Sequence, residues 1–177
     1  MTDLTELFCI VHDFEKEFEP EWKKMLISSP KVTRSPGISM SEIITILIFF
    51  HSSSFRNFKA FYQGFICLHY KKAFPHLPSY NRFVELKKRV LFPMQFFLFC
   101  LFGKSTGINF VDSTSIKVCH YKRSWAHKVF KGIAKAGHTS MGRFFGLKLH
   151  LITNDKGELL NVLLTPGNID DRVPVEW

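Results

Sequence analysis

INFVDST, residues 108–114, is the stretch that most constrains the fold and chemistry of the C-terminal half. Its β-branched and aromatic residues predict a short strand, and Asp112 lies where that strand gives way to hydroxyl residues. Residues 113–154, which follow, contain eight Lys or Arg and four His but no Asp or Glu. A lone carboxylate beside a stretch without negative charge favours a metal-binding acid that faces a polyanion. The structural alternative is an acid satisfied by local hydrogen bonds.

Composition predicts a folded protein with an anionic partner. The 177 residues suffice for one medium domain or two small ones, and a hydrophobic content of 46% excludes a disordered chain. The net charge of +9 is uneven, because residues 1–27 carry seven acids against three bases. This asymmetry favours binding to nucleic acid, or less often to a membrane surface. A solvated basic face without a partner remains the alternative.

The cysteines and the apolar runs exclude several protein classes. The four cysteines show no CxxC spacing, so neither a disulfide framework nor a zinc ribbon is indicated, and a reducing cytosol fits best. The N-terminus lacks the basic and then apolar pattern of a signal peptide. The apolar runs Ile43–Phe50 and Leu91–Phe102 are shorter than the roughly 20 residues of a membrane span. Both are predicted to be buried helices.

The first hundred residues have helical spacing. Apolar residues recur every three or four positions from Leu4 onward, and Pro30 and Ser35-Pro36-Gly37 predict a loop. A central helix is expected from Ser39 or Ser41 to about His51, with Glu42 in its first turn.

A further helix is predicted to begin near Tyr80, after a Ser79 cap. The residues expected on its buried side are Phe83, Val84, Leu86, Val90 and Leu91. Its exposed side is basic, so the pattern is compatible with a helix-turn-helix DNA reader. It is equally typical of an ordinary helical bundle, and spacing alone favours the bundle.

From about residue 108 the pattern changes to strands. We expect a strand ending at Asp112, a second at 116–119, an aperiodic basic stretch over 121–145 and a strand at 147–151. Asn154-Asp155-Lys156-Gly157 predicts a hairpin turn with Gly157 at a positive-φ position, and residues 158–165 form its return strand. A helix capped by Asp170 or Asp171 is expected to follow.

Asp112 is the best catalytic candidate, but its partner acids are few. Two-metal phosphoryl transfer needs at least two carboxylates, because hard cations prefer several oxygen ligands. Asp155 is explained by the turn, Asp170 or Asp171 by a helix cap, and Glu176 lies next to the C-terminus.

Two other chemistries are disfavoured. The hydroxyls at residues 113–115 have no nucleophile-elbow sequence around them. The spacing of Cys119, His120, His127 and His138 fits no zinc finger, and basic residues are interleaved among them.

Basic residues beside Trp125, Phe130 and Phe144 instead suit phosphate contact and base stacking. The candidate DNA-binding residues are Arg82, Lys87, Lys88, Lys117, Lys122, Arg123, Lys128, Lys131 and Lys148.

Five segments, in order, carry a family resemblance. They are LPSYNRF at 77–83, VDST at 111–114, HKVFKG at 127–132, GLKLH at 146–150 and LTPGN at 164–168. Together they resemble the bacterial insertion-sequence transposases that have a ribonuclease H-like DDE catalytic domain. The resemblance covers nearly the whole chain.

The resemblance implies an α+β fold with two regions of different function. Residues 1–105 would form a helical, helix-turn-helix-like DNA-binding region, and residues 106–177 the first strands of an incomplete ribonuclease H-like domain. Asp112 matches the first catalytic carboxylate and a ligand of Mg²⁺. Asp171 matches an acid that recurs after the Pro-Gly-Asn turn, in a supporting rather than catalytic role.

The chain departs from the family in its acids. The second acid of such families lies in an Asp-x-Gly-Tyr sequence and the third is a Glu on a later helix, and neither pattern occurs here. We therefore expect a C-terminally truncated transposase that binds DNA weakly at most and does not catalyse transposition. A non-catalytic DNA-binding protein is the alternative, and a relic without function a third possibility.

The family also implies partners and a location. Transposon ends and target DNA would be the partners, with no membrane, and assembly into a homo-oligomer is left open. The expected location is the bacterial cytoplasm, at the nucleoid.

Overall fold

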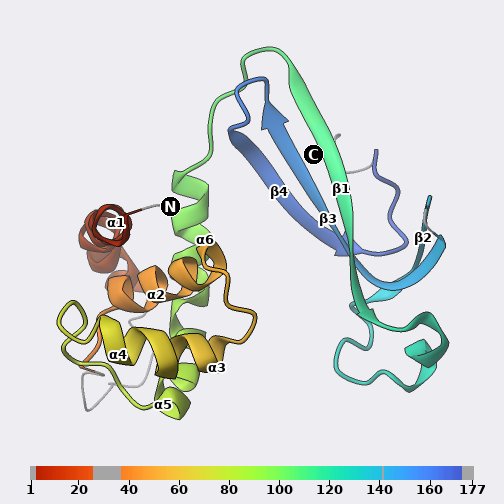
Figure 1. The fold of residues 1–177 in the computed structure, drawn as a ribbon. Coiled ribbons are helices and arrows are strands. Elements are labelled where there is room, and N and C mark those ends of the chain that lie inside the picture. Colours follow the sequence, from red (N-terminus) through yellow and green to blue (C-terminus); the bar gives the residue numbers. More distant parts are fainter. Residues whose placement is uncertain (1–2, 26–36, 141, 173–177) are drawn as a thin grey trace. The chain divides into compact units, whose positions relative to one another are not determined.

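The computed structural model describes residues 3–25, 37–140 and 142–172. It divides into two compact units, Met1–Cys100 and Leu101–Trp177, which are described separately below as unit 1 and unit 2. Unit 1 is helical and unit 2 contains a four-stranded antiparallel sheet, which confirms the predicted α+β class (Figure 1). Three parts of the sequence predictions lie outside the described residues. They are Pro30 and Ser35-Pro36 of the predicted loop, the helix expected after Arg172, and Glu176.

Unit 1 is built from short helical segments that follow one long helix. Its elements are α1 Leu4–Met25, α2 Met40–Ser52, α3 Phe58–Phe61, the π-helical η1 Tyr62–Ile66, α4 Cys67–His69, α5 Tyr80–Leu86, the 3₁₀ segment η2 Lys87–Val90 and α6 Leu91–Cys100. No helix in the described part of the chain is long and apolar enough to cross a membrane.

Helix α2 is central to unit 1, as its sequence predicted. Ser39 caps it: its hydroxyl accepts from the Glu42 N–H at 3.1 Å, and its own N–H donates to the Glu42 carboxylate at 2.7 Å. This reciprocal pair satisfies two backbone donors that the first helical turn leaves free. Glu15 of α1 accepts from the N–H groups of Met40 and Ser41, so a second carboxylate tethers the same helix start.

Aromatic rings fill the core beside α2. Phe61, Tyr62 and Phe83 are fully buried, and the Tyr62 and Phe83 rings lie 4.7 Å apart. The Tyr62 hydroxyl donates to the Pro78 carbonyl at 2.7 Å, so this buried polar atom has a partner. Burial raises the pKa of Tyr62 above its ordinary value. The core therefore fixes the 58–69 helical segment against α5.

Helix α6 is not the buried helix that its composition predicted. Leu91 is 66% exposed and Phe92 59% exposed, while Pro93 and Phe97 are its buried residues. Only one side of α6 packs against α1, where the Phe14 and Phe97 rings lie 5.1 Å apart. A helix that is apolar all round gives no periodicity from which its buried side can be read, so Leu91 was wrongly assigned to the core.

Unit 2 is organised around its longest strand. Its elements are β1 Asn109–Cys119, the 3₁₀ segment η3 Tyr121–Ala126, β2 Lys135–Thr139, β3 Gly142–Asn154 and β4 Leu159–Pro166. β1 pairs with β3 along one edge, while β2 and β4 pair with successive parts of β3 (Figure 1). Gly146 of β3 therefore pairs with both Lys117 and Lys135.

Two strand predictions need correction and one is confirmed. β1 is one continuous strand through residue 119, not two, with a register shift between Lys117 and Cys119. β2 was missed, because its five residues contain Gly137 and the polar His138 and Thr139 rather than a β-rich run. The hairpin between β3 and β4 is confirmed, with Gly157 at φ 79°.

Candidate functional site

Asp112 lies on β1 and is exposed. Its neighbour across the strand pair is Leu151 of β3, and its carboxylate accepts a hydrogen bond from the Ser113 N–H at 2.8 Å. β1 pairs with β3 along one edge, and no strand among the described residues pairs with its other edge. The carboxylate is therefore accessible to a ligand, although it already has a local hydrogen bond of the kind that a structural acid makes.

Strand alternation separates Asp112 from the second acid singled out by the sequence. Successive residues of a strand point to opposite faces, so Asp112 and Ser113 lie on different faces of the sheet. Ser113 pairs with His150 across β1 and β3, and the Asp171 carboxylate lies 3.0 Å from Lys148 Nζ and 3.9 Å from His150 Nδ1, which places Asp171 on the Ser113 face. Asp112 instead shares its face with apolar residues such as Leu149 and Leu151.

The Ser113 face carries a polar cluster in which Lys148, His150 and Thr165 are buried and Asp171 is exposed. Lys148 is 7% exposed, and its Nζ donates to the Ile169 carbonyl and to the Asp171 carboxylate, each at 3.0 Å. His150 is 1% exposed, and its Nε2 lies 2.8 Å from the Thr165 hydroxyl. These bonds fasten the segment after β4 onto the sheet.

Burial, hydrogen bonds and neighbouring charges together lower the pKa values of Asp171 and His150 below their ordinary values. Burial raises the pKa of Asp171, but the hydrogen bonds from Lys148 and Ser113 outweigh burial and leave it below its ordinary value. Burial lowers the pKa of His150, and this effect is larger than the opposing effect of the Asp171 charge, which raises it. The cluster thus holds Asp171 charged and His150 neutral at neutral pH.

The neutral His150 predicts that unit 2 loses stability in mild acid. A histidine whose folded pKa lies below its unfolded value gives stability that is complete above the unfolded pKa and is lost as the pH falls. Denaturant midpoints measured at about pH 7.5 and about pH 5.5 should therefore be higher at the higher pH. His150→Gln, which keeps a partner for Thr165, should remove most of this difference. An equal difference in the variant would assign the effect to another group.

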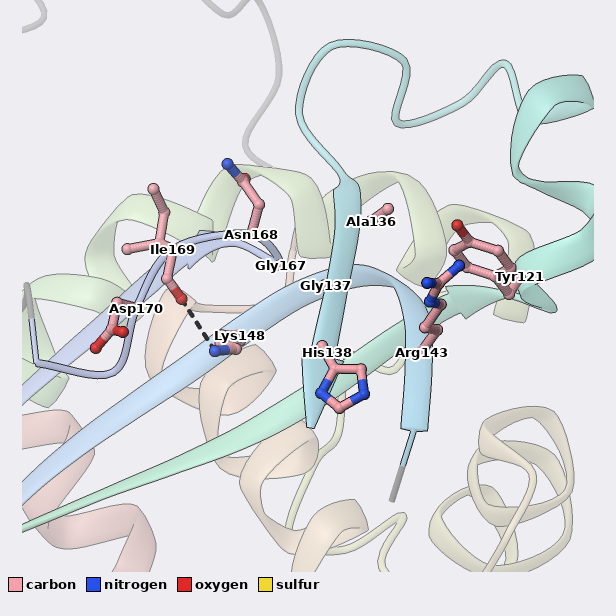
Figure 2. A pocket seen from close by; sticks show the side chains of 10 residues that line it. All are labelled: Tyr121, Ala136, Gly137, His138, Arg143, Lys148, Gly167, Asn168, Ile169 and Asp170. Carbon is pink, nitrogen blue, oxygen red and sulfur yellow. Dashed lines mark hydrogen bonds between the residues drawn. The ribbon is translucent and has the colours of Figure 1, made fainter. Parts of the chain in front are cut away.

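A cavity of about 410 Å³, the basic pocket, opens beside the polar cluster. Figure 2 shows its lining, in which Lys148 donates to the Ile169 carbonyl while His138 and Arg143 come from β2 and β3. Its one lining carboxylate, Asp170, accepts from the Arg172 N–H and Nε. Hydrogen bonds from Arg172 lower the pKa of Asp170, so this acid is charged and already partnered.

The predicted DNA-binding residues fall into three groups. Arg82, Lys87 and Lys88 are exposed in unit 1, and Arg82 is paired with Glu85 at 2.7 Å. Exposed residues of unit 2 form the second group: Lys117, Lys122, Arg123, Lys128 and Lys131. Lys148 stands alone, because its ammonium group is buried in the polar cluster. The sequence could not distinguish it from its neighbours, since the residues that cover it lie after β4.

The described residues do not fit a complete metal centre. Over residues 3–25, 37–140 and 142–172, no group of three His, Cys, Asp or Glu is placed to hold a cation. The other acids of unit 2 have contacts of their own: Asp155 accepts from the Thr106 hydroxyl, and Glu158 accepts from Asn154.

The polar cluster was the feature that sequence reasoning missed. Lys148 and His150 lie two residues apart in a strand, so alternation alone shows that they share one face. That face looked solvent-exposed, because nothing local signals that Thr165 and Asp171 return to cover it. The pairing of β3 with β4 supplies this information.

Comparison with known proteins gave a family match in the C-terminal part of the chain. Residues 102–177 match the family model described as Transposase DDE domain. A search of the curated proteins and a search of the solved structures each gave no significant match.

Proposed function

Because residues 102–177 match the family model described as Transposase DDE domain, we propose that the chain acts on DNA in the transposition of an insertion sequence. The observation that carries the proposal is this family match, and Asp112 lies within the matched residues, on β1. The exposed Lys and Arg side chains that follow Asp112, in a stretch without acids, supply the positive charge that phosphate contact needs.

Asp112 is proposed as the first catalytic carboxylate and a ligand of Mg²⁺. Its exposure on an edge strand supports this role. A magnesium ion would supply charge for phosphoryl transfer, but one carboxylate does not make a two-metal centre. Since the remaining described acids of unit 2 are engaged elsewhere, we propose that this chain alone binds DNA without cleaving it.

Asp171 is proposed as a positioning residue. Its ion pair with Lys148 holds the turn after β4 against the sheet, on the face opposite to Asp112. An acid in this position stabilises the strands that carry Asp112 and does not share a cation with it.

The proposed DNA contacts come from both units. In unit 2 they are the exposed basic residues Lys117, Lys122, Arg123, Lys128 and Lys131. In unit 1 they are Arg82, Lys87 and Lys88. Phosphate contacts of this kind make affinity fall steeply with salt. Transposon ends and target DNA are the proposed partners, in the bacterial cytoplasm at the nucleoid, and pairing of two DNA ends would favour a homo-oligomer.

The Asp112→Asn substitution tests the proposed role. The purified chain in Mg²⁺ is expected to bind DNA without strand transfer, and Asp112→Asn should bind at least as tightly, because it removes a negative charge facing the polyanion. Affinity would be measured by fluorescence anisotropy and strand transfer on gels. Asp155→Asn, an exposed acid in the β3–β4 turn, is the matched control.

Two outcomes would contradict the proposal. Strand transfer by the wild-type chain that Asp112→Asn abolishes would establish a complete enzyme. An absence of salt-dependent DNA binding would exclude action on DNA.

The second candidate function is a DNA-binding protein without a catalytic role. The basic helical segment 82–89 of unit 1 favours it, since it places exposed Arg82, Lys87, Lys88 and Arg89 close together in sequence. Binding of Mg²⁺ at Asp112 distinguishes the transposase from the non-catalytic DNA-binding protein. Mg²⁺ should protect Asp112 from chemical modification only if this carboxylate serves a metal site.

A further inference from the structure

The loop between β1 and β2 carries an aromatic side chain that is exposed and yet fixed. Trp125 is 88% exposed, and its Nε1–H donates to the Lys122 carbonyl at 3.0 Å within η3. The start of η3 is capped by His120, whose Nδ1 accepts from the Lys122 N–H at 3.3 Å. Because its polar atom is already bonded, the indole presents an apolar surface to solvent.

A second cavity, the aromatic pocket, opens beside Trp125. It has a volume of about 480 Å³, and its lining includes Trp125, His127, Lys128, Lys131 and Phe145. The volume lies within the range of small-molecule sites, which is roughly 300–1,000 Å³. The pocket lies wholly within unit 2, so its residues are positioned by one compact body.

Ring packing makes one wall of the aromatic pocket rigid. The His127 ring stacks on Phe130 at 5.9 Å with an interplanar angle of 3°, and it meets Phe145 edge-on at 6.1 Å. Phe145 belongs to β3, so these contacts connect the loop to the sheet. A planar group that enters the pocket would therefore find preformed aromatic surfaces.

The charge around the aromatic pocket is of one sign. Lys122, Arg123, Lys128 and Lys131 are exposed, and none of them forms an ion pair within the described part of the chain. Residues 113–154 contain no acid, so no nearby sequence neutralises them. Unpaired ammonium groups beside a fixed indole match the two parts of a nucleotide, a phosphate and a planar base.

From this placement we infer that the aromatic pocket binds an unpaired nucleotide of single-stranded DNA, with the base stacked on Trp125 and the backbone phosphates on Lys128 and Lys131. A paired base is stacked inside its duplex and cannot offer its face to the indole. The inference rests on the proposed function for its choice of DNA, and it assigns strand-separated DNA to this loop.

The test compares a thymidine oligonucleotide with a duplex, using the whole chain and fluorescence anisotropy at low salt. Trp125→Ala should weaken single-strand binding by about tenfold and leave duplex binding nearly unchanged, because stacking is open only to unpaired bases. Trp125→Phe should restore most of the affinity. Val129→Ala, at an apolar position of the same loop that is 80% exposed, is the matched control and should change neither affinity.

The possible outcomes distinguish a failure of this inference from a failure of the proposed function. Salt-dependent binding of both DNAs that Trp125→Ala does not alter would overturn the inference and leave the proposed function in place. No binding of either DNA would contradict the proposed function itself. Binding to phosphatidylserine vesicles that depends on Trp125, with oligonucleotide binding unaffected, would assign the loop to a lipid surface instead.

Discussion

Replacing Gly146 with alanine is expected to destabilise unit 2 by about 3 kcal/mol or more, since it overpacks a contact between two strands. A Cβ atom there would lie 2.0 Å from the Ile116 carbonyl oxygen and 3.2 Å from the Lys117 Cα. Both neighbours are backbone, so no side-chain rotation can relieve the clash. β1 must therefore move away from β3, and Asp112 moves with it.

Hydrogen exchange measured by mass spectrometry would check this result, as a loss of amide protection in β1 and β3. Gly64→Ala is the matched control, because nothing lies within 4 Å of the added Cβ and the residue is helical. That change should be neutral or stabilise the protein by up to about 1 kcal/mol. Wild-type protection in Gly146→Ala would show that β1 and β3 do not approach so closely.

Phe61→Ala is expected to cost unit 1 about 3–5 kcal/mol, a large part of the stability of a small domain. Phe61 is completely buried, and its ring lies within 6.1 Å of the rings of Phe49, Phe50, Phe55, Phe58 and Phe65. Truncation removes the central member of this group. The cavity that remains can close only if α2 and α3 move together.

The loss of helical circular dichroism during urea unfolding would measure this effect. Leu68→Ala provides the control, because Leu68 is 69% exposed and its truncation should change stability by no more than about 0.5 kcal/mol. A Phe61→Ala midpoint equal to that of Leu68→Ala would contradict the aromatic core. Unit 2 should unfold unchanged in both variants, since neither residue belongs to it.

The sequence predicted the elements whose signals are local. The Ser39–Glu42 capping box and the Asn154–Gly157 turn are formed by residues within four positions of each other, and both were found where expected. The exposed side of α6 and the burial of Lys148 depend on distant contacts. The former is set by α1 and the latter by the turn after β4, and neither contact leaves a periodic pattern in the sequence.

The candidate site was predictable to the same extent. Asp112 could be chosen from its position at the end of a β-rich run, which needs only neighbouring residues. The prediction that the strand ends there was wrong, because β1 continues to Cys119. Its separation from Asp171 onto opposite faces required the register of β1 against β3. The fixed orientation of Trp125 required the 3₁₀ turn, because its basic and aromatic neighbours alone do not show whether the indole is held or free.

The Asn154 turn has a consequence for how fast each strand joins the sheet. Asn154 is 1% exposed, and its amide donates to the Lys104 carbonyl and to Glu158 while its oxygen accepts from the N–H groups of Lys156 and Glu158. Three of these four bonds lie within the turn itself, and hairpins of this kind form in about 1–10 μs. β1 pairs residues far apart in sequence, such as Thr114 with Leu149, and must first close a long loop. Closing that loop is the slower step, so Asp112 takes its place on the sheet after the β3–β4 hairpin has formed.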